Sequence, residues 1–243
     1  MIQFIQPYYD EQELKVLQNK KTPCETTFGE LLRKVEYHLP DGHFMVTDSG
    51  EEAINALVRL IKMVRGLKCP VIAIPSIICG SVYRAVKDLG EITLMDADET
   101  WNCRMDSRSS VADIILFVGL SGKRMDVPCR TRAEQVIIDD SCQCYDGISG
   151  FRRESDFGVF SFGRGKQMYA GGGGLVYSRW PELTLLKGRV GSNLQKWQLS
   201  LMASQLAKID RINQLRTRNA EILLQRLNRS EERRVGKECA TGC

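Results

Sequence analysis

Apolar and polar residues alternate along the chain in short blocks that predict strands and helices in turn. Between the first strands, apolar residues at helical spacing predict helices over residues 51–65 and 80–89. Strands that alternate with helices in this way are typical of βαβ units. The pattern therefore predicts an α/β fold with a mainly parallel central sheet flanked by helices. Apolar runs bounded by turn-forming residues predict its strands at residues 43–47, 71–74, 91–95, 113–118, 136–139, 158–162 and 175–178.

The pattern changes in the last part of the chain. There, apolar residues recur every three or four positions and predict one long amphipathic helix over residues 195–228. A helix of that length spans about 45 Å, which suits a connector between two domains. We therefore expect an N-terminal arm or helix over residues 1–40, a large domain over 41–190, and a connector helix over 191–228 into a small domain that is mostly missing. Residues 229–243 resemble a translated sequencing adapter, and we expect them to be foreign to the natural protein.

Composition and charge narrow the classes of function. The chain is 43% hydrophobic and 26% charged, which is typical of a globular protein and not of a disordered one. Its apolar runs are too short to span a bilayer and it begins with no signal peptide, so we expect a cytoplasmic protein that does not bind membranes. The net charge of +4 is spread among interspersed acids and bases, which argues against a nucleic-acid-binding face. Nine cysteines without a CxxC pair predict reduced thiols and no metal site.

A lysine in a glycine-rich segment is the first candidate for chemistry. Lys166 follows a predicted strand in the sequence SFGRGKQ and precedes four consecutive glycines. A phosphate-binding P-loop is excluded, because Phe160 stands where its first glycine belongs and Gln167 where its serine or threonine belongs. A partly desolvated lysine can instead act as a nucleophile that forms a Schiff base. The alternative is a solvated lysine in a flexible loop.

Two further motifs lie at strand ends. Asp139 and Asp140 end an apolar strand, where open α/β sheets place their ligands. A carboxylate there can keep a ring nitrogen protonated, as pyridoxal phosphate (PLP) requires, or it can simply cap a turn. The segment TDSGE, which contains Ser49, Gly50 and Glu51, is a strand-to-helix turn whose amides could bind a phosphate or merely begin the helix. Phosphate cradle, acid and lysine, in that order along an α/β chain, match the layout of fold-type I PLP enzymes.

With these motifs, residues 1–228 resemble the DegT/StrS-type family of PLP-dependent nucleotide-sugar aminotransferases. The pairs Asp140/Gln143 and Ser161/Lys166 are the most specific part of the resemblance. Family branches that act as sugar dehydratases replace the lysine that stands here at position 166. The segments that carry the resemblance are TDSGEEA at residues 47–53, IPS at 74–76, MDAD at 95–98, IDDSCQ at 138–143, FSF at 160–162 and QLAKID at 205–210.

The resemblance implies a fold-type I large domain, PLP as cofactor, a homodimer with its site at the interface, and small-molecule substrates. It implies transfer of an amino group, usually from glutamate, to a keto-sugar nucleotide. Lys166 would form a Schiff base with the cofactor and later move a proton, and Asp140 would pair with its ring nitrogen. The remaining cofactor contacts would come from Gln143 near the phenolic oxygen and from Ser49, Gly50, Glu51 and Ser161 at the phosphate.

Several positions differ from the family pattern, among them the residues before the lysine, Gly163–Gly165, and Gly172 in the glycine-rich run. Glu51 replaces a threonine of the phosphate turn, and Cys79 replaces the aromatic residue that stacks on the cofactor ring. Asn193, the residue expected to reach the partner's phosphate, matches only after a shift of two residues. Two alternatives therefore stay open: another fold-type I PLP activity, and a PLP-fold protein that binds a cofactor or partner without turnover. Without a small domain to close the site, we expect the given chain to have little activity.

Overall fold

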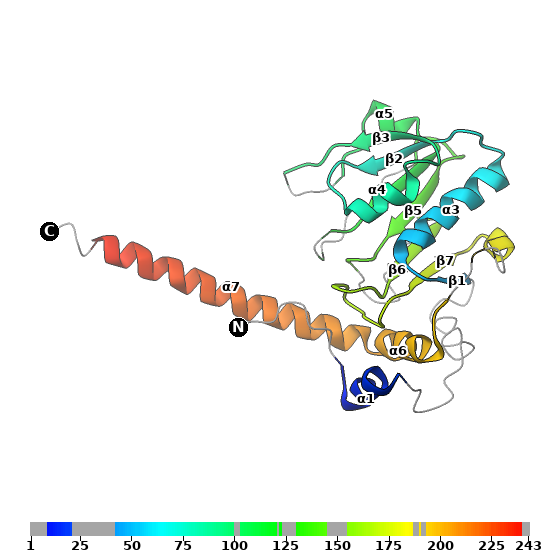
Figure 1. Cartoon of the computed structure of the whole chain (residues 1–243). Coiled ribbons are helices and arrows are strands. Elements are labelled where there is room, and N and C mark those ends of the chain that lie inside the picture. The colour runs from blue at the N-terminus through cyan, green and yellow to red at the C-terminus, as the bar shows by residue number, and fades with distance from the viewer. Residues whose placement is uncertain are drawn as a thin grey trace.

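The computed structural model describes residues 9–20, 42–99, 103–120, 122, 130–144, 155–186, 190 and 193–239. Within these residues, seven strands form one sheet in the order β1-β7-β6-β5-β4-β2-β3 (Figure 1). The strands lie within two residues of the predicted ranges. Their bounds are β1 His43–Thr47, β2 Val71–Pro75, β3 Glu91–Met95, β4 Ile114–Val118, β5 Val136–Asp140, β6 Phe157–Ser161 and β7 Gly174–Ser178.

Most neighbouring strands run parallel, as the sequence pattern predicts. The pairs among β2, β3, β4, β5 and β6 are all parallel, whereas β7 is antiparallel to both β6 and β1. Among the described strands, β7 alone therefore runs against the others. All five residues of β4 and of β5 are buried. Burial of every position is typical of central parallel strands covered on both faces.

A long helix covers one face of the sheet. Helix α3, Gly50–Arg65, begins at Ser49, whose side chain accepts a hydrogen bond from the Glu52 amide at 3.1 Å, and ends at Gly66 in the left-handed conformation. Its buried stripe packs with β1, β6 and β7 into the larger apolar core. Helix α3 contacts the shorter helix α4, Gly80–Val86, and the 3-10 helix η2, Pro181–Leu186, whereas α5, Ser107–Ser110, contacts β3.

The other face, at the β1 edge, is covered by helices from the two ends of the chain. Helix α1, Glu11–Asn19, lies against α6, Lys196–Ala207 (Figure 1). Val16 of α1 and the buried side of α6 share an apolar cluster with Phe44, Tyr177 and Phe160 of β1, β7 and β6. The N-terminal segment is therefore fixed to the region where the chain enters its last helices.

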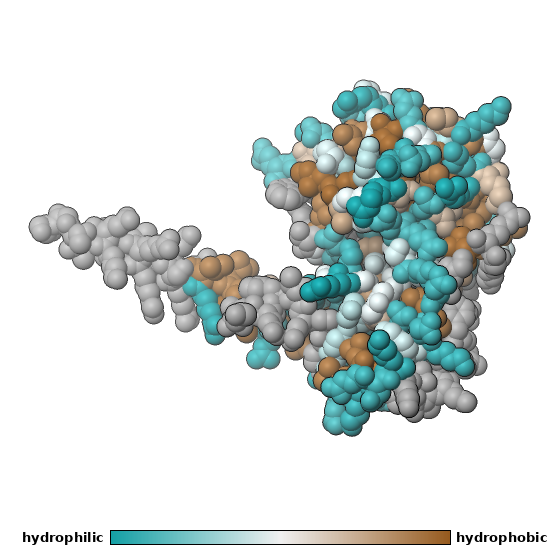
Figure 2. Space-filling model, in the orientation of Figure 1, coloured by the Kyte–Doolittle hydropathy of each residue, from teal (hydrophilic) through white to brown (hydrophobic). Residues whose placement is uncertain are grey.

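The prediction of one continuous helix after residue 195 is wrong. The chain forms α6 and then α7, Ile209–Cys239, with Lys208 between them in a non-helical conformation (φ −110°, ψ 5°). The side chain of Lys208 turns toward α1 and forms ion pairs with Asp10 and Glu13. Helix α7 projects away from the body of the molecule (Figure 1), and Figure 2 shows apolar residues at its surface. Leu224 and Leu227 of this helix are exposed.

None of the helices in the described part of the chain combines the length and apolarity that crossing a membrane requires. The predicted domain limits stay predictions, and α1 is the described part of the expected N-terminal arm.

Candidate active site

The predicted phosphate-binding residues meet at one edge of the sheet. Ser161 ends β6 and pairs with Gly174 at the start of β7, which in turn pairs with Thr47 at the end of β1. Gly50 is the first residue of α3, and the first turn of this helix lies beside Ser161. A Cβ atom built on Gly50 would be 3.1 Å from the Ser161 Cβ. The structure therefore brings Ser161 next to the helix N-terminus, whose amides are suited to an anion.

Gly174 is a residue whose importance the sequence did not reveal. A Cβ atom at this position would lie 2.4 Å from the Ser49 carbonyl oxygen and 2.5 Å from the Thr47 Oγ1. The Thr47 hydroxyl donates to the same Ser49 oxygen at 2.8 Å. The turn before α3 thus packs directly on the backbone of β7, and only glycine leaves room for it.

Asp140 provides a buried carboxylate at the end of β5. Its side chain is 4% exposed, and the Cys142 amide donates to its Oδ1 at 3.0 Å. Within the described residues, Cys142 is the only residue that donates hydrogen bonds to this carboxylate. Burial raises the pKa of Asp140, and the hydrogen bonds from Cys142 and the charge of Lys166 oppose this rise only in part. The carboxylate therefore has acceptor capacity left for a further donor.

Lys166 lies in the loop between β6 and β7, near Asp140. The ends of the loop are joined by the Phe162 amide, which donates to the Gly173 carbonyl at 2.9 Å, and the Lys166 amide donates to Gly163 at 3.2 Å. Gly165 adopts φ 81°, a conformation that favours glycine. The Lys166 side chain is half-buried, and its ammonium forms no hydrogen bond or ion pair with the described residues. Its charge acts on Asp140 and on the Cys79 thiol.

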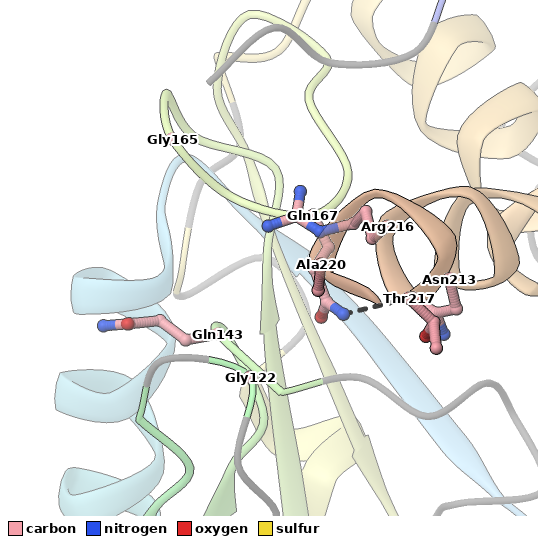
Figure 3. Close-up of a pocket in the computed structure, with 8 residues that line it drawn as sticks. All are labelled: Gly122, Gln143, Gly165, Gln167, Asn213, Arg216, Thr217 and Ala220. Atoms are coloured by element: carbon pink, nitrogen blue, oxygen red, sulfur yellow. Dashed lines mark hydrogen bonds between the residues drawn. The ribbon is translucent and has the colours of Figure 1, made fainter. Parts of the chain in front are cut away.

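A polar pocket of about 640 Å³ opens beside this loop (Figure 3). Gln143, predicted to lie near the cofactor, lines it together with Gly165, which precedes the lysine. The remaining described lining residues are Gly122, Gln167 and four residues of α7, namely Asn213, Arg216, Thr217 and Ala220. The sequence pattern gave no functional signal for this face of α7, because polar residues at helical spacing are typical of any solvated helix surface.

No protein-family model matches the chain, and neither does any curated protein. Solved structures do match. The Escherichia coli GDP-4-keto-6-deoxy-D-mannose-3-dehydratase with bound hydrated PLP aligns over 93% of this chain and 72% of its own, with a TM-score of 0.70 at 17% identity. Helicobacter pylori PseC, an aminotransferase of pseudaminic acid biosynthesis, aligns over 85% and 65%, with a TM-score of 0.66 at 17% identity. A synthase of 3-amino-5-hydroxybenzoic acid aligns over 84% and 63%, with a TM-score of 0.63 at 20% identity.

The chain has the large-domain fold of fold-type I PLP enzymes. The structural match to DegT/StrS-type sugar aminotransferases extends over most of the chain, although the chain spans only 63–72% of the length of these three structures. At these identities the likeness establishes the fold. The roles of individual residues stay predictions.

Glu51, the acidic residue at the predicted phosphate turn, is paired with a cation. Glu51 forms a two-point ion pair with Arg84 of α4, at 2.8 and 3.2 Å. The carboxylate of Glu52 accepts a hydrogen bond from the Asp48 amide at 2.8 Å. Both acids of the first helical turn therefore have partners, so neither carboxylate is left unpaired at the predicted phosphate-binding turn. Sequence reasoning missed Arg84, which lies on a different helix from Glu51.

Cys79 lies at the N-terminal end of α4 with its side chain exposed. The Ser81 hydroxyl donates to its sulfur at 3.2 Å. Hydrogen bonds from Ser81 lower the pKa of the Cys79 thiol, and the nearby charge of Lys166 lowers it further. The position expected to stack on the ring of a fold-type I cofactor therefore holds a polar thiol near the lysine.

Asn193 lies beside the phosphate turn of its own chain. Its side-chain amide donates to Asp48 at 2.7 Å, directly before the turn residue Ser49. Residues 191 and 192 of the expected Gly-x-Asn segment lie outside the described residues. The predicted role of Asn193 across a fold-type I dimer interface stays a prediction.

Proposed function

We propose that the protein is a PLP-dependent aminotransferase that transfers an amino group, from glutamate, to a keto-sugar nucleotide. The observation that carries the proposal is the position of Lys166. Its ammonium has no hydrogen-bond partner among the described residues, and its charge acts on a buried carboxylate, Asp140. A lysine at this position favours aminotransfer over dehydration, because dehydratases of the resembling family replace it.

The described residues fit PLP. Asp140 has unused acceptor capacity in a buried setting, where a charge-assisted hydrogen bond to a ring N–H is strong. Ser161, and the amides at the start of α3 that form no hydrogen bond with a described residue, offer donors for a phosphate. The bound cofactor would supply an electron sink for the carbanion chemistry of transamination. Lys166 Nζ would take up a proton and return it to a neighbouring atom, and it can do so because no ion pair with a described residue holds its charge.

A second function is favoured by one observation, the thiol at position 79. Without an aromatic face at the ring, the site could hold the cofactor less firmly, and the protein could then bind PLP or a partner without turnover. The resemblance further supports a homodimer.

Trapping the lysine tests the proposal. The purified chain is incubated with PLP and reduced with borohydride, and the modified peptides are mapped by mass spectrometry. We expect the adduct on Lys166 at near-stoichiometric yield, and none at this site in Lys166→Ala. The exposed Lys196 serves as the matched control, because Lys196→Ala should leave the yield at Lys166 unchanged. Equal modification of Lys166 and exposed lysines, or none at Lys166, contradicts the proposal.

Turnover separates the two candidate functions. An adduct on Lys166 together with glutamate-dependent loss of the cofactor absorbance supports an aminotransferase. An adduct without any response to amino donors supports the binding protein instead.

A further inference from the structure

The described lining of the pocket beside the lysine loop carries positive charge only. Of its described lining residues, Arg216 is the only one with a charged side chain, and none is acidic. Its volume of about 640 Å³ falls within the range of small-molecule sites, about 300–1,000 Å³. The other side chains around it are amides, a hydroxyl and a methyl group. The described part of the lining therefore offers a positive centre among neutral hydrogen-bonding groups.

One face of α7 forms a wall of this pocket. Asn213, Arg216, Thr217 and Ala220 are spaced at intervals of three and four residues, so they share one side of the helix. The Gln167 amide donates to Asn213 at 3.1 Å and ties this face to the lysine loop. The distance between helix and loop is therefore set by a direct contact.

The guanidinium of Arg216 is available to a ligand. It forms no ion pair or hydrogen bond with the described part of the chain, and neither does the hydroxyl of Thr217, the next residue. In Figure 3 the Arg216 side chain extends from α7 toward the loop that carries Gly165. A guanidinium presents paired N–H donors that match the two oxygens of a carboxylate or phosphate.

We propose that this pocket binds an oxyanion of a substrate, a carboxylate or a phosphate, through the guanidinium of Arg216. The inference deepens the proposed function and rests on it, since Gly165 of the pocket adjoins Lys166. Two sources share this chemistry: the distal carboxylate of a dicarboxylic amino donor, and the diphosphate of a sugar nucleotide. In both cases α7 would act as a specificity element that holds the charged end of a substrate whose reacting end faces the lysine.

Calorimetric titration of the PLP-loaded chain tests this inference. The probes are glutarate and uridine diphosphate, with glutaramide and uridine as neutral counterparts. We expect at least one anionic probe to bind, and Arg216→Gln to weaken that binding by about tenfold to a hundredfold. Arg216→Lys keeps the charge but loses the paired donors, so we expect an intermediate loss. Arg218→Gln is the matched control, because Arg218 is exposed on another side of α7 and does not line the pocket.

The outcomes distinguish the two sources and the two proposals. If Arg216→Gln loses affinity for glutarate alone, the pocket binds the amino donor. If it loses affinity for uridine diphosphate alone, the pocket binds the acceptor. Equal affinity of wild type and Arg216→Gln for both probes overturns the inference, as does the absence of binding to wild type. Borohydride trapping on the same samples reports separately on the proposed function. A Lys166 adduct, together with an unchanged probe affinity in Arg216→Gln, contradicts only the proposed oxyanion site.

Discussion

Lys208 holds the N-terminal helix to the junction between α6 and α7, and its replacement by methionine tests that contact. The ammonium forms ion pairs with Asp10 and, at 2.7 Å, with Glu13. The Glu13 side chain is 3% exposed, so Lys208→Met leaves a buried carboxylate without its cation. The Glu13 carboxylate also accepts hydrogen bonds at 3.0 Å from the Gln205 side chain and from the Asp10 amide.

These remaining bonds set the size of the effect. Breaking a fully buried pair costs about 3–5 kcal/mol, and an exposed pair is worth about 0–1 kcal/mol. Because Glu13 keeps two donors and Lys208 is partly exposed, we expect Lys208→Met to lower the free energy of unfolding by about 2 kcal/mol. For a chain of this size that corresponds to a fall in Tm of about 4–8 °C.

Urea denaturation followed by circular dichroism measures the change. Lys196→Met, at an exposed lysine, should stay within about 0.5 kcal/mol of wild type. The double variant Lys208→Met/Glu13→Gln should recover about 1 kcal/mol relative to Lys208→Met, because the unpaired charge is gone. If Lys208→Met and Lys196→Met are equally stable, the argument from the buried carboxylate is refuted.

The pH dependence of this contact has a definite sign. Hydrogen bonds from the Lys208 side chain and from the Glu13 amide lower the pKa of Asp10. The contribution of Asp10 to the free energy of unfolding is therefore present above a pH of about 4, and it is lost as the pH falls through the folded-state pKa. Burial opposes the shift at Lys208, but hydrogen bonds to Asp10 and Glu13 outweigh it and raise the pKa. That contribution is present below a pH of about 10 and is lost as the pH rises. The difference between wild type and Lys208→Met should therefore be largest between these limits.

Three further predictions concern the candidate site. Asp140→Asn should reduce transamination at least about a hundredfold, because an amide cannot hold a ring nitrogen protonated, while thermal unfolding shows no loss of stability; unchanged turnover contradicts this role. Gly174→Ala should destabilise the fold by about 1–3 kcal/mol and weaken PLP binding, because its Cβ would meet the Ser49 carbonyl oxygen at 2.4 Å; a stability equal to wild type would show that the turn can shift freely. Arg84→Gln should weaken binding of PLP but not of pyridoxal, because it leaves the Glu51 carboxylate unpaired at the phosphate turn, and Glu51→Gln should restore binding. Equilibrium titration with both vitamers measures this last effect.

The strands could be predicted closely because their patterns are local. Buried parallel strands such as β4 consist of continuous apolar runs, and turn-forming residues mark their ends. The direction of β7 could not be predicted in the same way, since it depends on which strands it pairs with. The break at Lys208 was missed for a related reason. At the break, Lys208 forms ion pairs with residues from the other end of the chain, whereas the local apolar spacing continues through it.

In the candidate site, too, local motifs could be predicted from the sequence, and contacts between distant segments could not. Motifs at strand ends placed Asp140, Ser161 and Lys166 at one edge of the sheet, because parallel strands bring their carboxyl ends together. The ion pair that neutralises Glu51 and the pocket face of α7 depend on contacts between distant segments. An exposed arginine on a polar helix has no local signature that separates it from a solvated one. The functional roles assigned through the family resemblance stay predictions.

The pairing of β1 with β7 has a consequence for how the protein is made. Among the described strands, β1 is synthesised first, but its partner β7 is synthesised last. Most of the sheet is synthesised between the two, so β1 waits as an unpaired apolar segment, which is prone to wrong associations. Non-local pairing of this kind is intrinsically slow. Because the turn before α3 packs on Gly174 of β7, this turn acquires its shape only when β7 pairs with β1. A nascent chain that ends before β7 therefore contains the predicted phosphate-binding residues but lacks the strand on which their turn packs.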